Sequence, residues 1–286
     1  MRRSRGIRVG VAALVAVLGV AGVADAQPKR PAGKKPPIET GPKFTLTPEL
    51  AQKLEGGDEA AAKAALDDVK LAGKAAAAAV PAIKKLLDGG ASLALAEAAL
   101  ETLGETESPD AAAAIAPYAG HRNPRLRRAA MKGLIRAKGP QSVPTLRRSL
   151  SDPDAQVRGL AATGLGALKA RESTADLVVA LDHKVTEAAA SVGQLCTPAE
   201  CDALTARVGR LPFDVVTSGL DQVLFRPAED MPDDAKIKVV GRLRELGTME
   251  ANKFLKDVQG RWPKTWSPRV RQALEQAVLA TSGGAE

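Results

Sequence analysis

Residues 152–165 read DPDAQVRGLAATGL, and the stretch 31 positions earlier, residues 121–134, reads HRNPRLRRAAMKGL. Sliding the chain by 31 residues lays Val157-Arg158 on Leu126-Arg127, Ala161 on Ala130, Gly164-Leu165 on Gly133-Leu134, Leu177 on Leu146, and Leu181 on Leu150. Self-similarity at a fixed period of this length is the signature of a repeat architecture. The sequence therefore predicts an array of similar units and not one irregular globular domain.

Each unit carries the apolar spacing of two helices. The first helix shows it at Leu126, Ala130 and Leu134, and the second at Val143, Leu146 and Leu150. The predicted helix starts pair a capping residue with proline: Thr47-Pro48, Asn123-Pro124, Asp152-Pro153, Thr197-Pro198 and Ser267-Pro268. The predicted ends are glycines: Gly89-Gly90, Gly104 and Gly139. One such pair cannot bury its apolar stripe alone, so the pairs are expected to stack.

Composition agrees with an all-helical array. Aromatic residues make up only 2% of the chain, while alanine, the best helix former, is abundant. The triplet Gly164-Leu165-Gly166 falls inside a predicted helix, where it favours close helix packing over a phosphate-binding loop.

The stretch 152–165 resembles HEAT repeats, in particular the short bacterial kind named after phycobilisome lyases, and SPRVRQAL at 267–274 carries the signature again. The resemblance is strong over residues 80–185, fair over 235–280, and weak over 49–78 and 200–230. It implies an all-α fold, a right-handed α-solenoid of about six or seven stacked antiparallel helix pairs over residues 49–282. The spacing shortens after residue 182, where Val185 matches Val157 at a shift of 28. In this family the signature Asp and Arg link neighbouring units, which implies structural inter-repeat roles for Arg127, Asp152, Arg158 and Arg271.

The N-terminus predicts export. Four arginines precede an apolar run from Val9 to Val23, and Ala24-Asp25-Ala26 follows it, so residues 1–26 are interpreted as a signal peptide cleaved after Ala26. The apolar run is shorter than the roughly 20 residues that a membrane-spanning helix needs. Residues 27–48 are rich in Pro and Lys and are expected to form a disordered tether, and residues 283–286 a disordered tail. The predicted location is the periplasm or the medium, with a retained signal anchor as the alternative.

The charge is banded. Residues 121–171 hold 12 basic and 2 acidic residues, between acidic flanks at 49–120 and 172–286. After the inter-repeat arginines are set aside, the candidate partner-binding residues are Arg122, Arg125, Arg128, Lys132, Arg147 and Arg148. Such a band favours an acidic protein partner, with an anionic envelope polymer as the alternative and a solvated face without ligand as the bland interpretation. Export and the scarcity of stacking aromatics argue against nucleic acid.

The two cysteines, Cys196 and Cys201, flank a predicted capping box that begins at Thr197. A disulfide at this corner is the favoured interpretation in an oxidising compartment. The alternatives are a redox-active dithiol, which usually has two residues between its cysteines, and a metal site, which needs more ligands.

No catalytic, cofactor-binding or metal-binding pattern is found. Only two histidines exist, His121 and His183, and neither belongs to the His-Glu pair that the HEAT-repeat enzyme deoxyhypusine hydroxylase uses for its metal. The sequence shows neither a phosphate-binding glycine loop followed by Lys nor a nucleophile elbow. We therefore predict a non-enzymatic scaffold that binds a protein partner; the alternative is a subunit of an envelope enzyme with an unrecognised site in the groove.

Overall fold

The computed structural model describes residues 44–282, which form helices and turns with no strand in that range. The predicted signal peptide, most of the predicted tether and the predicted tail lie outside the described residues. The helices are α1 (Pro48–Glu55), α2 (Glu59–Ala72), α3 (Val80–Asp88), α4 (Leu93–Glu105), α5 (Pro109–Ile115), α6 (Pro124–Ala137), α7 (Ser142–Ser149), α8 (Ala155–Ala167), α9 (Thr174–Asp182), α10 (Ala188–Leu195), α11 (Cys201–Thr205), α12 (Phe213–Leu224), α13 (Asp233–Leu246), α14 (Met249–Arg261) and α15 (Pro268–Ser282). Three short 3₁₀ segments are η1 (Gly73–Ala79), η2 (Ala116–Gly120) and η3 (Arg171–Ser173).

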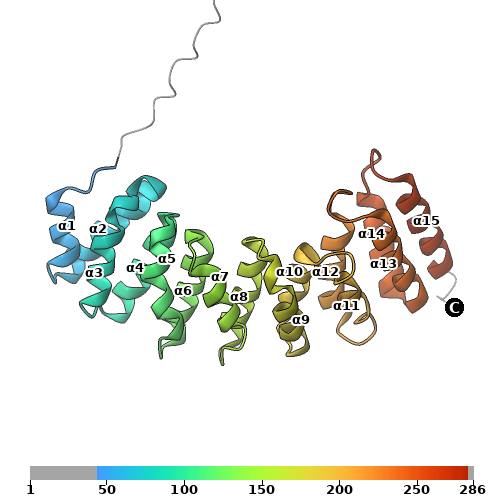
Figure 1. The fold of residues 1–286 in the computed structure, drawn as a ribbon, viewed down its shortest axis with the longest axis horizontal. Helices are drawn as coiled ribbons and strands as arrows, with labels where there is room; N and C mark the ends of the chain where they lie inside the picture. The colour runs from blue at the N-terminus through green and yellow to red at the C-terminus, as the bar shows by residue number, and fades with distance from the viewer. Residues whose placement is uncertain (1–43, 283–286) are drawn as a thin grey trace, which may run out of the picture. The chain divides into compact units, whose positions relative to one another are not determined.

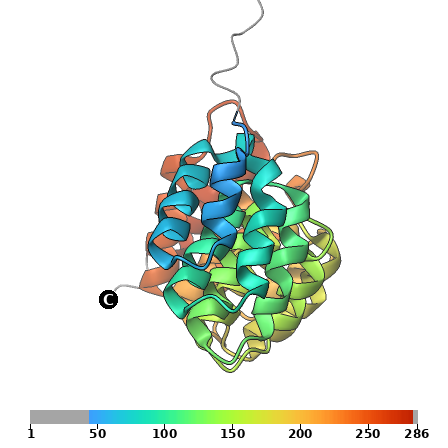
Figure 2. The ribbon, with the colours of Figure 1, turned by 90° about the vertical axis from the view of Figure 1, so that its left-hand side faces the viewer.

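The helices from α1 to α12 form two rows, which Figure 1 shows side by side along the stack. Each even-numbered helix from α2 to α12 packs on the next even one, and each odd helix from α1 to α11 packs on the even helix that follows it. Figure 2 looks along this stack, with the N-terminal helices in front. The signature helices α6 and α8 belong to the even row, so the second helix of each unit lies in the odd row. This is the stacked helix-pair arrangement of HEAT and armadillo solenoids.

Local sequence explains where most helices begin. Thr47, Asn123 and Ser267 accept a backbone N–H of the first turn, and each is followed by proline at the first helical position. Proline fits there because its missing N–H would have no helical partner. These starts agree with the sequence prediction.

The predicted start at Asp152-Pro153 is wrong by two residues. Helix α8 begins at Ala155, and Asp154 is its cap, accepting from the N–H of Val157 at 3.0 Å. Asp152 instead binds Arg127 of the preceding unit. A tertiary ion pair has taken the side chain that the local pattern assigned to capping.

Two predicted helix ends also differ. Gly104 lies inside α4, where an added Cβ would lie 2.9 Å from the Cα of Gly133, so it serves helix packing. After α6 the left-handed residue is Lys138, with φ 55°, in place of Gly139. The same turn recurs 31 residues later at Lys169, also with φ 55°. The turn geometry therefore repeats with the period even where the residue type is unfavourable.

The core consists of small and aliphatic side chains, which allow the even-numbered helices to approach closely. Gly164 and Gly166 are both buried in α8, in contact with Ile135 and Ser191 respectively, as the packing interpretation of this triplet predicts. The closest approach lies between α10 and α12, where a Cβ on Gly193 would lie 2.1 Å from the carbonyl oxygen of Gly219. Glycine is required at this contact because the two backbones touch.

The stacking changes after α12. Helix α12 packs broadly on α10 but only narrowly on α13 and α14, whereas α13, α14 and α15 pack extensively on one another. The segment 225–232 takes the place of a second helix after α12. An aromatic cluster lies beside it, in which Trp262 and Trp266 meet edge to face at 5.3 Å and Phe225 approaches both rings.

The ordered chain begins earlier than residue 49. Phe44 and Leu46 pack against the core, so the predicted tether does not extend to residue 48. Among residues 44–282 the helices lack the combination of length and hydrophobicity that a membrane span requires.

Candidate binding surface

Ion pairs join consecutive units along the stack. Arg127 in α6 donates to both carboxylate oxygens of Asp152, each at 2.8 Å, and to the carbonyl oxygens of His121 and Arg122 in its own turn. Both side chains are close to buried, with 11% and 8% of their surface exposed. A bidentate, part-buried pair of this kind fixes the angle between two units more firmly than an exposed pair.

Arg158 and Arg271 make only half of this arrangement. Arg158 donates to the carbonyls of Asp152 and Pro153, and Arg271 to those of Pro263 and Lys264. Neither reaches a carboxylate within the described chain. For Arg158 the reason is sequence: Arg127 pairs 25 residues downstream with Asp152, and the residue 25 positions after Arg158 is His183. These arginines therefore brace the turn before their own helix and do not bridge two units by an ion pair.

Three of the candidate partner-binding arginines are held by neighbouring units. Arg125 pairs with Glu97 at 2.6 Å, Arg128 with Asp154, and Arg147 with Asp176 at 2.6 Å. The hydrogen bond from Arg128 lowers the pKa of Asp154 to about 2, and the same bond raises the pKa of Arg128. Carboxylates of adjacent units thus offset much of the basic band.

The other three candidates make no ion pair within residues 44–282. Arg122 is exposed in the turn before α6, Lys132 is exposed on α6, and Arg148 is exposed on α7 with one contact to the Thr145 hydroxyl at 3.4 Å. Lys132 lies in the even row, whereas Arg148 lies in the odd row. The structure therefore does not gather the six candidates into one patch, and Arg148 is the member that remains open on the second-helix face.

Two grooves flank α7 on this second-helix face. The α5–α7 groove has a volume of about 470 Å³. One wall consists of small residues of α5 and η2, among them Ala113, Pro117 and Gly120, and the other wall carries Gln141 and Arg148.

The α7–α9 groove has a volume of about 600 Å³. Its walls include Arg147 on α7 and Val179 on α9, an apolar side chain that is 56% exposed. Asp152 borders both grooves, so they adjoin.

Ionisable side chains converge in the α7–α9 groove, but their contacts are structural. Arg147 is paired with Asp176, Asp152 with Arg127, and Arg158 binds backbone carbonyls. No group of three or more His, Cys, Asp and Glu residues in the described part of the chain is arranged to hold a metal ion. His183 ends α9, and the ring of His121 accepts the N–H of Asn123 at 3.0 Å, so both histidines lie in turns.

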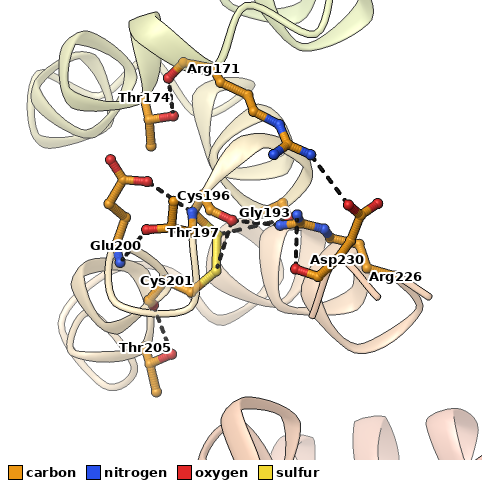
Figure 3. The surroundings of a disulfide bond; sticks show 10 residues. All are labelled: Arg171, Thr174, Gly193, Cys196, Thr197, Glu200, Cys201, Thr205, Arg226 and Asp230. Carbon is orange, nitrogen blue, oxygen red and sulfur yellow. Dashed lines mark hydrogen bonds and ion pairs between the residues drawn. A yellow bond between two sulfur atoms is a disulfide. The ribbon is translucent and has the colours of Figure 1, made fainter. Parts of the chain in front are cut away.

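Cys196 and Cys201 form a disulfide at the corner between α10 and α11, as Figure 3 shows. The capping box is formed as well: Thr197 N donates to Glu200 Oε2 at 2.8 Å, and Glu200 N donates to Thr197 Oγ1 at 3.3 Å. The carbonyl oxygen of Cys196 accepts Arg226 Nη1 at 2.6 Å, and Arg226 also donates to Asp230 O (Figure 3). The disulfide corner is therefore tied to the segment that follows α12.

Sequence reasoning missed this connection and the lysine beyond it. Lys236, in α13, is only 2% exposed and lies against Trp262 and Trp266. A signal was present, because both tryptophans of an aromatic-poor chain fall within five residues of each other. Nothing local marked Lys236, since its burial depends on the fold.

Stacked helix pairs, ion pairs between units and grooves along the second helices define an α-solenoid repeat protein. The family described as HEAT repeats matches residues 80–155 and again residues 113–190, and the chain is a HEAT-repeat protein.

Solved structures of similar fold include three helical-repeat proteins. The phycocyanin lyase complex of CpcE and CpcF from Nostoc sp. PCC7120 has 18% identity and a TM-score of 0.45, with 88% of this chain and 100% of that chain covered. Human deoxyhypusine hydroxylase has 15% identity and a TM-score of 0.38, with 82% and 95% covered. A designed armadillo repeat protein has 14% identity and a TM-score of 0.40, with 82% and 99% covered. These are likenesses of fold alone. No curated protein matches the chain in sequence.

Proposed function

We propose that this protein is a non-enzymatic scaffold that binds an extended segment of a partner protein across the second helices α5, α7 and α9. The observation that carries the proposal is the pair of adjoining grooves on either side of α7. Neighbouring helices lie about 8–10 Å apart, which an extended chain crosses in about three residues. One continuous segment can therefore occupy both grooves.

The groove walls indicate the chemistry of that segment. The alanines, Pro117 and Gly120 of the α5–α7 groove let a peptide backbone approach closely, and Arg148 offers a guanidinium without a carboxylate partner in the described chain. Val179 offers an exposed apolar contact in the second groove. We infer a partner segment with an acidic residue at Arg148 and an apolar residue about three positions away at Val179.

The test is a comparison of matched charge reversals. Arg148→Glu should abolish capture of the partner from the native envelope, and Arg244→Glu, an equal change on exposed α13, should leave it intact. Arg147→Glu is unsuitable, because it would also break the pair with Asp176. Capture by the Arg148→Glu variant at the wild-type level would refute the proposed surface.

Binding to an anionic polymer has less support than protein binding. Six of the 12 basic residues in the band 121–171 pair with carboxylates, so little uncompensated charge remains on any one face. A partner recognised by shape and by one or two charges fits this surface better. Binding that disappears at moderate salt, where exposed charges are screened, would favour the polymer instead.

We also propose that the protein is exported to the periplasm or the medium. The N-terminal sequence supports this, and so does the Cys196–Cys201 disulfide, because disulfides persist in oxidising compartments. Sequencing the N-terminus of the mature protein from a bacterial envelope should give Gln27. A mature protein that retains residues 1–26 and fractionates with the cytosol would rule out export.

A further inference from the structure

Lys236 is a buried amine in a chain whose other lysines are at the surface. It has 2% of its surface exposed, and its Nζ donates to the carbonyl oxygen of Arg226. The Nζ lies 4.9 Å from the ring centre of Trp266 and 5.5 Å from that of Trp262. It makes no ion pair with a carboxylate in the described chain. Lysine is almost never buried without such a pair, so this position requires an explanation beyond packing.

The surroundings of Lys236 favour its neutral form. Burial lowers the pKa of the ammonium below its ordinary value, and the nearby guanidinium of Arg226 lowers it further, against the opposing effects of Asp233 and Glu229. A neutral amine has a free electron pair and is a nucleophile, whereas an ammonium is not. Desolvation beside another cation is one of the known ways to activate a lysine.

A cavity opens onto the amine. It has a volume of about 310 Å³, at the lower end of the range of about 300–1,000 Å³ found for small-molecule sites. The indoles of Trp262 and Trp266 form one side, and Glu229, Asp233 and Thr265 lie on the others. Indole faces stack on flat conjugated groups, so the cavity fits a small planar molecule.

We propose that Lys236 is a covalent attachment site for small planar aldehydes, which it takes as an imine in this cavity. The Nζ electron pair attacks the carbonyl carbon, the C–N bond forms, and the carbonyl oxygen takes up a proton. The carbinolamine then loses water as the C=N bond forms, with no oxidant or reductant needed. Asp233 and Glu229 line the cavity and are the carboxylates available to carry the proton from nitrogen to oxygen.

The test uses benzaldehyde with cyanoborohydride at neutral pH, followed by mass spectrometry of the peptides. Lys236 should be labelled about tenfold faster than Lys238, which is exposed and paired with Asp202, since each unit of pKa lowering gives tenfold more neutral amine. The labelling rate of Lys236 should also reach half its maximum at a lower pH than that of Lys238.

Two variants separate reactivity from structure. Lys236→Arg keeps a cation over the indoles and should lose the label at this position while the helical circular dichroism is unchanged. Trp266→Leu removes the stacking face and should slow labelling of Lys236 but not of Lys238. If Lys236 in the wild type reacts more slowly than Lys238, the amine only fastens the fold and the proposal is overturned. Arg148→Glu should not change the labelling, so this site and the proposed partner surface fail or stand separately.

Discussion

At the scale of single residues, the clearest irregularity is the missing ion pair at Arg158. Arg127 has Asp152 as its partner in the next unit, whereas the matching position for Arg158 is His183. Both Arg158 and His183 border the α7–α9 groove, so the two positions face the same space. The repeat geometry is present there, and only the carboxylate is absent.

We expect His183→Asp to supply that carboxylate. The new pair should raise the free energy of unfolding by about 1 kcal/mol, the upper end for a part-exposed pair with good geometry. Denaturant unfolding of the variant should show the gain at low salt and lose most of it in 1 M NaCl. His183→Asn is the control, because it has a similar shape without the charge. Equal stability of the Asp and Asn variants would show that the units do not meet there as they do at Arg127.

Asp154 gives a pH dependence whose sign follows from its pKa. Arg128 holds that pKa at about 2 in the folded protein, below the ordinary value of 3.8. The folded state therefore gains stability from this carboxylate above pH 3.8 and loses the gain as the pH falls from 3.8 toward 2. Asp154→Asn, which preserves the capping geometry, should be less stable than the wild type at pH 5. The difference should fade by pH 2, and a difference that grew with acidity would contradict this assignment. The same change at Asp110, an exposed carboxylate at the start of α5, should show no such trend.

At the scale of helices, glycine sets how closely the even-numbered row packs. Gly193 and Gly219 bring the backbones of α10 and α12 into contact, and a methyl group on Gly193 has only rigid backbone to displace. Gly193→Ala should lower the free energy of unfolding by roughly 3 kcal/mol, because neither helix can yield without moving its neighbours. Thermal unfolding followed by circular dichroism measures the change.

The matched control lies in another helix. Gly241 is inside α13 with no atom within 4 Å of a would-be Cβ, so Gly241→Ala should stabilise by about 0.5–1 kcal/mol through helix propensity alone. The two variants make the same chemical change with opposite expected signs. If both stabilise, the close approach of α10 and α12 is looser than described.

Helix scale is also where sequence reasoning succeeded best and where its errors are informative. The 31-residue period and the capping residues before proline predicted the helix pairs, because both signals are local and repeat along the chain. The start at Asp152 and the end at Gly139 were misplaced because a distant arginine took one side chain and Lys138 adopted the left-handed turn. The candidate arginines were chosen by charge alone, and sequence does not show which of them a carboxylate 26 to 29 residues away will neutralise. Arg226 and Lys236 were missed for the same reason, since their partners lie in other helices.

At the scale of the whole described chain, the stack has one narrow joint. In repeat proteins each unit contacts only its neighbours, so stability is a sum of local interfaces and the weakest interface opens first. Between α12 and α13 the helix contacts are few, and polar links take their place. Arg226 is central among them: it donates to Cys196 O and Asp230 O, and its own carbonyl accepts Lys236.

Removing Arg226 should therefore uncouple the last three helices from the rest. Hydrogen bonds from a charged donor contribute about 1.5–3 kcal/mol, so Arg226→Ala should speed amide exchange in α13–α15 by roughly ten- to a hundredfold while α6 and α8 keep their protection. The double variant Cys196→Ala/Cys201→Ala should weaken the same joint, because the disulfide corner holds the carbonyl that Arg226 binds. Arg242→Ala removes the same charge from an exposed pair within α13 and should leave exchange unchanged. A rise spread evenly from α2 to α15 would mean that the chain opens as one cooperative body, because a narrow joint held by Arg226 predicts that protection is lost only beyond it.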